Sequence, residues 1–269
     1  MASRPKRLPR VITVRRADYL SPNMIRVTFA GPELEGFPPG HEGANCKLIL
    51  PREGESREEF ETYFAPDGPE EKVHAVRTYT IRSFRPESLE LDIDFVAHGD
   101  NGPATRWAQR ATEGAFLGLL GPGPAKLTDF YADWYLIAAD LSALPVAEAT
   151  LEALPADAHG AAVFEVPSKE DIRSITVPKG VEVTWLVQED VHKPSTAQVD
   201  LIRGLDWPSG TVQTCIAGES SVIRALRDYL HNERNVPKKD TYISGYWKIG
   251  LIEDQHQQMK RAEAAAVQA

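Results

Sequence analysis

The chain has 269 residues, of which 42% are hydrophobic and 26% charged, and its formal net charge is −9. This composition is normal for a soluble globular protein and leaves room for two ordinary domains or one large one. The acidic balance argues against nucleic acid as the main partner, because phosphate binding needs a basic field.

The first 16 residues are rich in arginine and lysine, but no apolar stretch follows them, so we predict neither an export signal nor a membrane anchor. The chain has two cysteines, Cys46 and Cys215. Two isolated thiols fit a reducing cytosol better than a disulfide framework, and they are too few for an all-cysteine iron–sulfur cluster. We therefore expect a cytoplasmic protein with no membrane partner, and a monomer by default.

Six short strands are predicted in the first part of the chain, separated by Gly, Pro and Asp. They cover residues 11–14, 24–29, 45–50, 79–84, 89–96 and 115–120. In the fifth strand, apolar residues alternate regularly with acidic ones, which is typical of a half-buried strand. Strands at this spacing favour a small antiparallel barrel over residues 7–124. The acidic residues 51–76 are interpreted as a long surface excursion.

The Gly-Pro-Gly-Pro segment at residues 121–124 marks the predicted domain boundary. Beyond it, apolar runs that are typical of strands covered on both faces alternate with helical patterns. Strands are predicted at 134–139, 161–166, 181–187, 212–217 and 241–244, and helices at 145–154, 196–203 and 221–230. This alternation predicts a parallel sheet of about five strands in an α/β domain over residues 125–250. Residues 251–269 form a polar tail that we expect to be helical.

Two polar clusters, separated by one predicted strand, can converge on a single ligand. The first offers the guanidinium of Arg77, the ring of Tyr79 and the hydroxyl of Thr80, with Arg77 and Tyr79 on one face of a strand and Thr80 on the other. The second is a predicted helix start at Gly102 and Pro103, whose N–H groups and dipole suit an anion. Each cluster alone also fits an ordinary exposed arginine or an ordinary capped helix. Together they suit a planar ligand that carries a diphosphate, and FAD is the obvious candidate.

Both clusters belong to a longer pattern: Arg77-x-Tyr79-Thr80-x-Arg82, then Asp94-Phe95-Val96-x-His98-Gly99-x-x-Gly102-Pro103-Ala104-x-x-Trp107-Ala108. This pattern resembles the siderophore-interacting proteins, a branch of the ferredoxin–NADP reductase-like flavoproteins named for releasing iron from ferric siderophores. The resemblance continues through residues 139–145 and 217–219 and ends at Gly245-Tyr246-Trp247-Lys248-x-Gly250. It implies a six-stranded antiparallel Greek-key barrel that binds flavin, followed by a parallel-sheet α/β domain similar to nucleotide-binding domains.

The resemblance also implies which residues bind FAD. The implied set is Arg77, Tyr79, Thr80, Asp94, Val96, His98, Gly99, Gly102, Pro103, Ala104, Thr105, Asp140, Ser142 and Ala143. The last three would lie where the α/β domain faces the cofactor, beyond the carboxyl end of its first strand. Leu141 departs from the family, in which an acidic residue is more typical, so a contact from position 141 is in question. His98 is interpreted as positioning the ring or a phosphate, and the remaining histidines show no metal-ligand spacing.

Glu219 precedes the predicted helix 221–230. The resemblance implies nicotinamide-nucleotide binding near this residue, whereas a favourable interaction with the helix dipole explains it equally well. No G-x-G-x-x-G fingerprint occurs, so the sequence does not predict tight NAD(P) binding. Single lysines are usually solvated, but the resemblance implies a basic cluster of Lys47, Lys248 and Lys126 that would bind an anionic ferric chelate.

The predicted function is therefore an FAD-dependent ferric-siderophore reductase in which the flavin, rather than a catalytic side chain, transfers the electrons. NADPH, NADH or ferredoxin would supply electrons, and Fe(III) would leave the siderophore as the more weakly held Fe(II). Two alternatives stay open. One is an NAD(P)H–flavin oxidoreductase that serves another acceptor, and the other is a siderophore or flavin carrier whose cofactor does not turn over.

Overall fold

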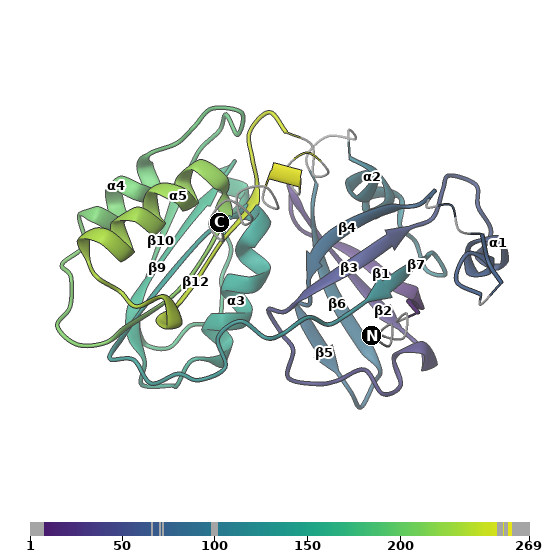
Figure 1. Ribbon diagram of the computed structural model, residues 1–269, viewed down its shortest axis with the longest axis horizontal. Coiled ribbons are helices and arrows are strands. Elements are labelled where there is room, and N and C mark those ends of the chain that lie inside the picture. Colours follow the sequence, from purple (N-terminus) through teal and green to yellow (C-terminus); the bar gives the residue numbers. More distant parts are fainter. Residues whose placement is uncertain are drawn as a thin grey trace, which may run out of the picture. The chain divides into compact units, whose positions relative to one another are not determined.

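The computed structural model describes residues 8–65, 67–69, 71, 73–97, 102–251, 255 and 258–259. The chain divides into two compact units, Met1–Lys126 and Leu127–Ala269. Figure 1 shows that the first is mainly a curled β-sheet and the second a sheet covered by helices. No helix within the described ranges is long and apolar enough to span a bilayer. The helix expected over the tail falls mostly outside the described residues.

The first unit is an antiparallel sheet with the described strand order β4-β3-β7-β1-β2-β6-β5. Its strands are β1 (Arg10–Ser21), β2 (Met24–Ala30), β3 (Asn45–Leu50), β4 (Ala75–Thr80), β5 (Ser83–Arg85), β6 (Glu90–Val96) and β7 (Phe116–Leu120), and its helical segments are η1 (Pro32–Leu34), α1 (Arg57–Thr62) and α2 (Pro103–Arg110). The two end strands of this order, β4 and β5, follow one another in the chain. The sheet therefore curls around its apolar core, as the predicted barrel requires.

The prediction of one strand over residues 79–84 was wrong, and the described sheet has seven strands rather than six. The chain changes its partner strand at Ile81 and Arg82. The Ile81 N–H donates to Ala44 O, next to β3, at 2.9 Å, whereas the Arg82 N–H donates to Asp92 O on β6 at 3.0 Å. The adjacent polar residues Arg82 and Ser83 interrupt the alternation of apolar and polar residues at this corner, and the prediction of one strand passed over that interruption.

Residues 51–76 are also more than a surface excursion, because they contain α1 and its fully buried Phe60. A capping box begins α1: Glu59 N–H donates to Ser56 Oγ, and Ser56 N–H donates to the Glu59 carboxylate. The Nε2 atom of His74 lies 2.9 Å from Glu55 Oε2, and the imidazole ring packs edge-on against Phe60. The S-x-x-E spacing was a local signal for this helix start that the sequence analysis did not use.

The second unit contains a parallel sheet with the described strand order β10-β9-β8-β11-β12. Its strands are β8 (Trp134–Asp140), β9 (His159–Val166), β10 (Gly180–Val187), β11 (Val212–Glu219) and β12 (Thr241–Trp247). Its helices are α3 (Leu144–Ala153), α4 (Ala197–Arg203) and α5 (Ser220–Asp228), with shorter turns η2 (Leu141–Ala143), η3 (Lys169–Asp171), η4 (Tyr229–Glu233) and η5 (Lys238–Asp240).

The predicted alternation of strands and helices in this unit is confirmed. Helices α4 and α5 cover one face of the sheet and α3 covers the other (Figure 1). From β8 the chain builds the sheet outward in one direction through β9 and β10, and then returns to add β11 and β12 on the other side of β8. The place where the strand order reverses, the topological switch point, therefore lies between β8 and β11. Open parallel sheets bind ligands beyond the carboxyl ends of their strands at such a point.

Candidate functional site

The first predicted cluster lies on β4, which contains Arg77, Tyr79 and Thr80. Alternate side chains of a strand face opposite sides, so Arg77 and Tyr79 share one face of β4. The half-buried Tyr79 ring packs on Phe95 of β6, with 4.4 Å between the ring centroids. Thr80, on the other face, is 5% exposed. Tyr79 is thus held against the barrel core while part of its ring stays accessible.

The second predicted cluster is the start of α2, where Gly102 is the N-cap, Pro103 lies in the first turn, and no side chain among the described residues caps the helix. Pro103 is exposed, and Ala104 and Thr105 are buried. Gly102 has an ordinary extended backbone, with φ −102° and ψ 140°. Apart from its chain neighbours, a Cβ built there would meet only Thr105 Oγ1 among the described atoms within 4 Å, at 3.7 Å. The described residues therefore do not require glycine here, whereas a ligand that approaches the backbone would.

Phe95 joins the two clusters. Its ring contacts Tyr79 on one side and Trp107 of α2 on the other, at 5.7 Å between the centroids of Phe95 and Trp107. The Thr105 hydroxyl also donates to Val96 O at 3.1 Å, which ties the start of α2 to the end of β6. Within this unit, the end of β6 therefore connects the strand that carries Arg77 and Tyr79 with the first turn of α2. This set of groups fits a diphosphate-linked flavin.

Asp94 belongs to the predicted cofactor set, but its carboxylate is engaged within the chain. Arg26 of β2 lies directly opposite Asp94 and donates Nε and Nη2 to its two oxygens, at 2.7 and 2.8 Å. The Asp94 side chain is fully buried. The pair therefore fixes the end of β6 against β2. His98 and Gly99, also in the predicted set, lie outside the described residues.

The β3 strand places Lys47 outside and its neighbours inside, as predicted: Cys46 and Leu48 are buried, and Lys47 is exposed. The Lys47 ammonium donates to Thr78 Oγ1 of β4 at 2.5 Å. Cys46 lies opposite Tyr79, and burial raises the pKa of its thiol to about 12. The thiol beside Tyr79 is therefore protonated at neutral pH, which leaves it unreactive as a nucleophile.

At the carboxyl end of β8, Asp140 organises the turn η2. Its carboxylate accepts hydrogen bonds from Ser142 N at 2.9 Å, from Ser142 Oγ at 2.6 Å and from Trp247 Nε1 at 2.7 Å. Burial raises the pKa of Asp140, and these hydrogen bonds oppose that effect. Leu141 is 6% exposed and Ala143 is fully buried, so the unusual leucine packs inside the unit rather than offering a contact to a ligand.

Glu219 caps the N-terminus of α5. Its Oε2 accepts from Ser221 N at 2.6 Å and Val222 N at 3.3 Å, as well as from the Ser221 hydroxyl. Its Oε1 accepts from Ile249 N at 3.3 Å. This geometry agrees with the favourable interaction with the helix dipole that the sequence left open, and nucleotide binding near Glu219 stays a prediction.

The sequence analysis missed two side chains at this edge of the sheet. Glu165 of β9 lies directly opposite Asp140 in the parallel register and accepts from Ser195 Oγ at 2.7 Å. Burial raises the pKa of Glu165, and the Asp140 charge adds to that rise. The second missed side chain is Trp247, whose indole was not given a role. Both depend on strand register, which no local sequence signal carries.

The other two predicted lysines lie in different units. Lys126 ends the first unit, and Lys248 follows β12 in the second. The half-buried Lys248 ammonium donates to Met259 Sδ at 3.4 Å. A thioether is neutral and a weak acceptor, so among the described residues this contact does not neutralise the ammonium.

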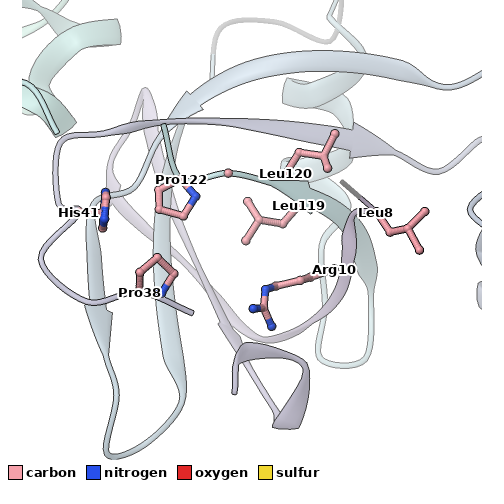
Figure 2. A pocket seen from close by; sticks show the side chains of 8 residues that line it. Leu8, Arg10, Pro38, His41, Leu119, Leu120 and Pro122 are labelled. Atoms are coloured by element: carbon pink, nitrogen blue, oxygen red, sulfur yellow. The ribbon is translucent and has the colours of Figure 1, made fainter. Parts of the chain in front are cut away.

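Figure 2 shows a hollow in the first unit, lined by Leu8, Arg10, Pro38, His41 and residues 119–122. The Arg10 guanidinium donates to the carbonyl oxygens of Glu33 and Glu35, at 2.7 and 2.8 Å, and is thereby engaged with the chain. None of the predicted site residues lines this hollow. The described part of the chain also contains no cluster of side chains that could hold a metal ion.

Comparison with known proteins matches residues 13–126 to a family model described as the siderophore-interacting FAD-binding domain, and residues 132–250 to one described as siderophore-interacting protein. The ferric vibriobactin reductase ViuB of Vibrio cholerae is 37% identical over 257 residues, covering 91% of this chain and 92% of that protein. The siderophore-interacting protein SipS of Aeromonas hydrophila superposes with a TM-score of 0.82 at 32% identity, covering 97% of this chain and all of that one. A siderophore utilization protein from T. fusca gives 0.75 at 30% identity, covering 91% and 94%.

Proposed function

Since the chain belongs to the siderophore-interacting protein family, we propose that it is an FAD-dependent oxidoreductase that reduces ferric siderophores. The observation that carries the proposal is the arrangement at the end of β6 in the FAD-binding domain: Phe95 packs on Tyr79 of β4 and on Trp107 of α2, and Val96 O accepts from Thr105 in the first turn of α2. A relative named as a ferric vibriobactin reductase supports the choice of acceptor.

In this proposal, the residues of the first unit bind and orient the cofactor. Arg77 pairs with the diphosphate, and Tyr79 packs on the flavin side of the molecule. The backbone N–H groups that follow Gly102 bind phosphate oxygens at the helix N-terminus. Asp94 contributes through its pair with Arg26, and Thr105 through its bond to Val96. Bound flavin supplies the step between two-electron donors and one-electron Fe(III).

The electron donor is NADH, NADPH or reduced ferredoxin in this proposal, and the second unit is the place for a pyridine nucleotide. Asp140, Ser142 and Ala143 would face the cofactor beyond β8. An acceptor that is an anionic Fe(III) chelate needs local positive charge in a chain with a net charge of −9. Lys47 and Lys248 supply it, with Lys126 as a third candidate. A cytoplasmic monomer is proposed together with this function.

An anaerobic electron-transfer experiment tests the proposal. The purified protein should show an oxidised flavin spectrum that bleaches with one of the three donors. Adding a ferric siderophore should then restore the spectrum and release Fe(II), measured with a ferrous-specific chelating dye. Flavin that stays oxidised with every donor would support the carrier alternative. Reduced flavin that free flavin or quinone reoxidises, but no ferric chelate does, would support the oxidoreductase with another acceptor.

Replacing Lys47 or Lys248 by glutamine should weaken binding of an anionic ferric chelate by about five- to tenfold at low salt, because each change removes one charged contact. The loss should shrink as salt is raised, since exposed charges are then screened. Lys179→Gln is a matched control, because Lys179 is exposed at the amino end of β10, away from the carboxyl edge of the sheet. Variants that bind as tightly as the parent across a salt titration would contradict the assignment.

A further inference from the structure

The segment that carries Lys248 is fastened to three other elements of the second unit. Trp247 Nε1 donates to Asp140 Oδ2 at the end of β8, at 2.7 Å. Ser220 Oγ, in the first turn of α5, donates to Trp247 O at 2.8 Å. Ile249 N–H donates to Glu219 Oε1 at the end of β11, at 3.3 Å. Residues 247–249 are therefore bonded both before and after Lys248, which leaves its backbone little freedom.

The hydrogen bond between Trp247 and Asp140 joins two strands, β12 and β8, that are separated by β11. β12 pairs with β11, and β11 pairs with β8, so the indole of Trp247 must pass over β11 to reach Asp140. It does so beside Gly218, whose φ of +150° is a glycine conformation. A Cβ at Gly218 would lie 2.7 Å from Asp140 Oδ2. A larger residue at 218 would therefore displace the carboxylate that receives the indole.

Packing alone does not explain a carboxylate in this position. Asp140 is half-buried, and its hydrogen bonds with Ser142 and Trp247 come from uncharged donors. A partly desolvated carboxylate with such partners stabilises the fold less than an apolar side chain of similar volume would. The carboxylate instead orients two groups separately: its Oδ1 accepts from Ser142 in η2, and its Oδ2 accepts from the Trp247 indole.

We propose that Asp140 and Trp247 are positioning residues for the substrate: their hydrogen bond across Gly218 holds residues 247–249 so that the Lys248 ammonium is presented to the anionic chelate. This inference rests on the proposed function. Lys248 is suited to that role because its contact with Met259 Sδ is one that an anion can displace. A lysine on a segment that is already fixed loses less conformational freedom when it binds an anion.

The test uses equilibrium binding of the redox-inert gallium(III) complex of 2,3-dihydroxybenzoate to the FAD-loaded protein. Trp247→Phe keeps the ring but removes the N–H donor, and it should raise the dissociation constant about fivefold. Asp140→Asn should weaken binding as well, and the two changes together should cost less than the sum of both, because they act through one bond. Trp185→Phe, the same replacement on β10, is the matched control and should leave binding unchanged.

A second comparison separates positioning from a general loss of structure. In a Lys248→Gln background, Trp247→Phe should have no further effect on binding, and FAD content should equal that of the parent in the Trp247→Phe, Lys248→Gln and Trp185→Phe variants. An unchanged dissociation constant for Trp247→Phe, or an equal loss with and without Lys248, would overturn the inference. A parent protein that binds neither the gallium complex nor its ferric counterpart would contradict the proposed function itself.

Discussion

The Gly102→Asp variant is expected to be more stable than the parent when free of FAD, and yet to bind FAD at least about a hundredfold more weakly. The backbone at Gly102 already has the extended conformation of an N-cap, and a Cβ finds space there. An aspartate would cap α2 and complement its dipole, which should stabilise the FAD-free protein by about 0.5–1 kcal/mol. The same carboxylate would occupy the amides proposed for the diphosphate and repel it.

Thermal unfolding without cofactor and a fluorescence titration with FAD measure the two effects separately. Gly102→Asn is the matched control, because asparagine caps a helix as well as aspartate but carries no charge. Its affinity for FAD should fall by about tenfold only, since it competes for the amides without repelling the phosphates. Parent-like affinity in the aspartate variant would show that the diphosphate does not bind at the start of α2.

The α/β unit was more predictable than the barrel, and the reason is physical. Strands buried on both faces of a parallel sheet need long apolar runs, such as Trp134 to Ala139, and these stand out between helical patterns. The barrel strands are less uniform, from the three residues of β5 to the twelve of β1, and at Ile81 and Arg82 the chain changes partner within a run that was predicted as one strand. The two adjacent polar residues at 82 and 83 are a weak signal beside such long apolar runs.

The residues of the candidate site were also predictable to different degrees, depending on whether their role is local or set by distant partners. Residue types with a local meaning were predictable: a glycine and a proline at a helix start, or a lysine on the outer face of a strand. The engagement of the carboxylates was not, because their partners are distant in the sequence. Asp94 meets Arg26 from 68 residues away, and Trp247 reaches Asp140 across 107 residues. Such contacts follow from register and strand order, which exist only in the folded sheet.

Arg26→Met is expected to destabilise the first unit by about 3–5 kcal/mol, because it leaves the fully buried Asp94 carboxylate without its bidentate partner. The melting temperature of the FAD-free protein should fall by about 10 °C or more. Met retains much of the length and apolar surface of the arginine stem, so the loss reports on the charge pair. Arg110→Met, which removes an arginine from its exposed ion pair with Glu53, is the control and should cost much less.

Replacing both partners, Arg26→Met with Asp94→Leu, should recover most of the stability, because no unpaired charge is then buried. The FAD affinity of this double variant decides what Asp94 does. If Asp94 only holds β6 against β2, as its pair with Arg26 indicates, the refolded double variant should bind FAD within about threefold of the parent. A protein that recovers its melting temperature but loses FAD by a larger factor would mean that the Asp94 carboxylate leaves Arg26 to contact the cofactor. The melting temperature reports on the buried charge and the FAD affinity reports on contact with the ligand, so the two measurements together separate a structural role of Asp94 from a cofactor-binding one.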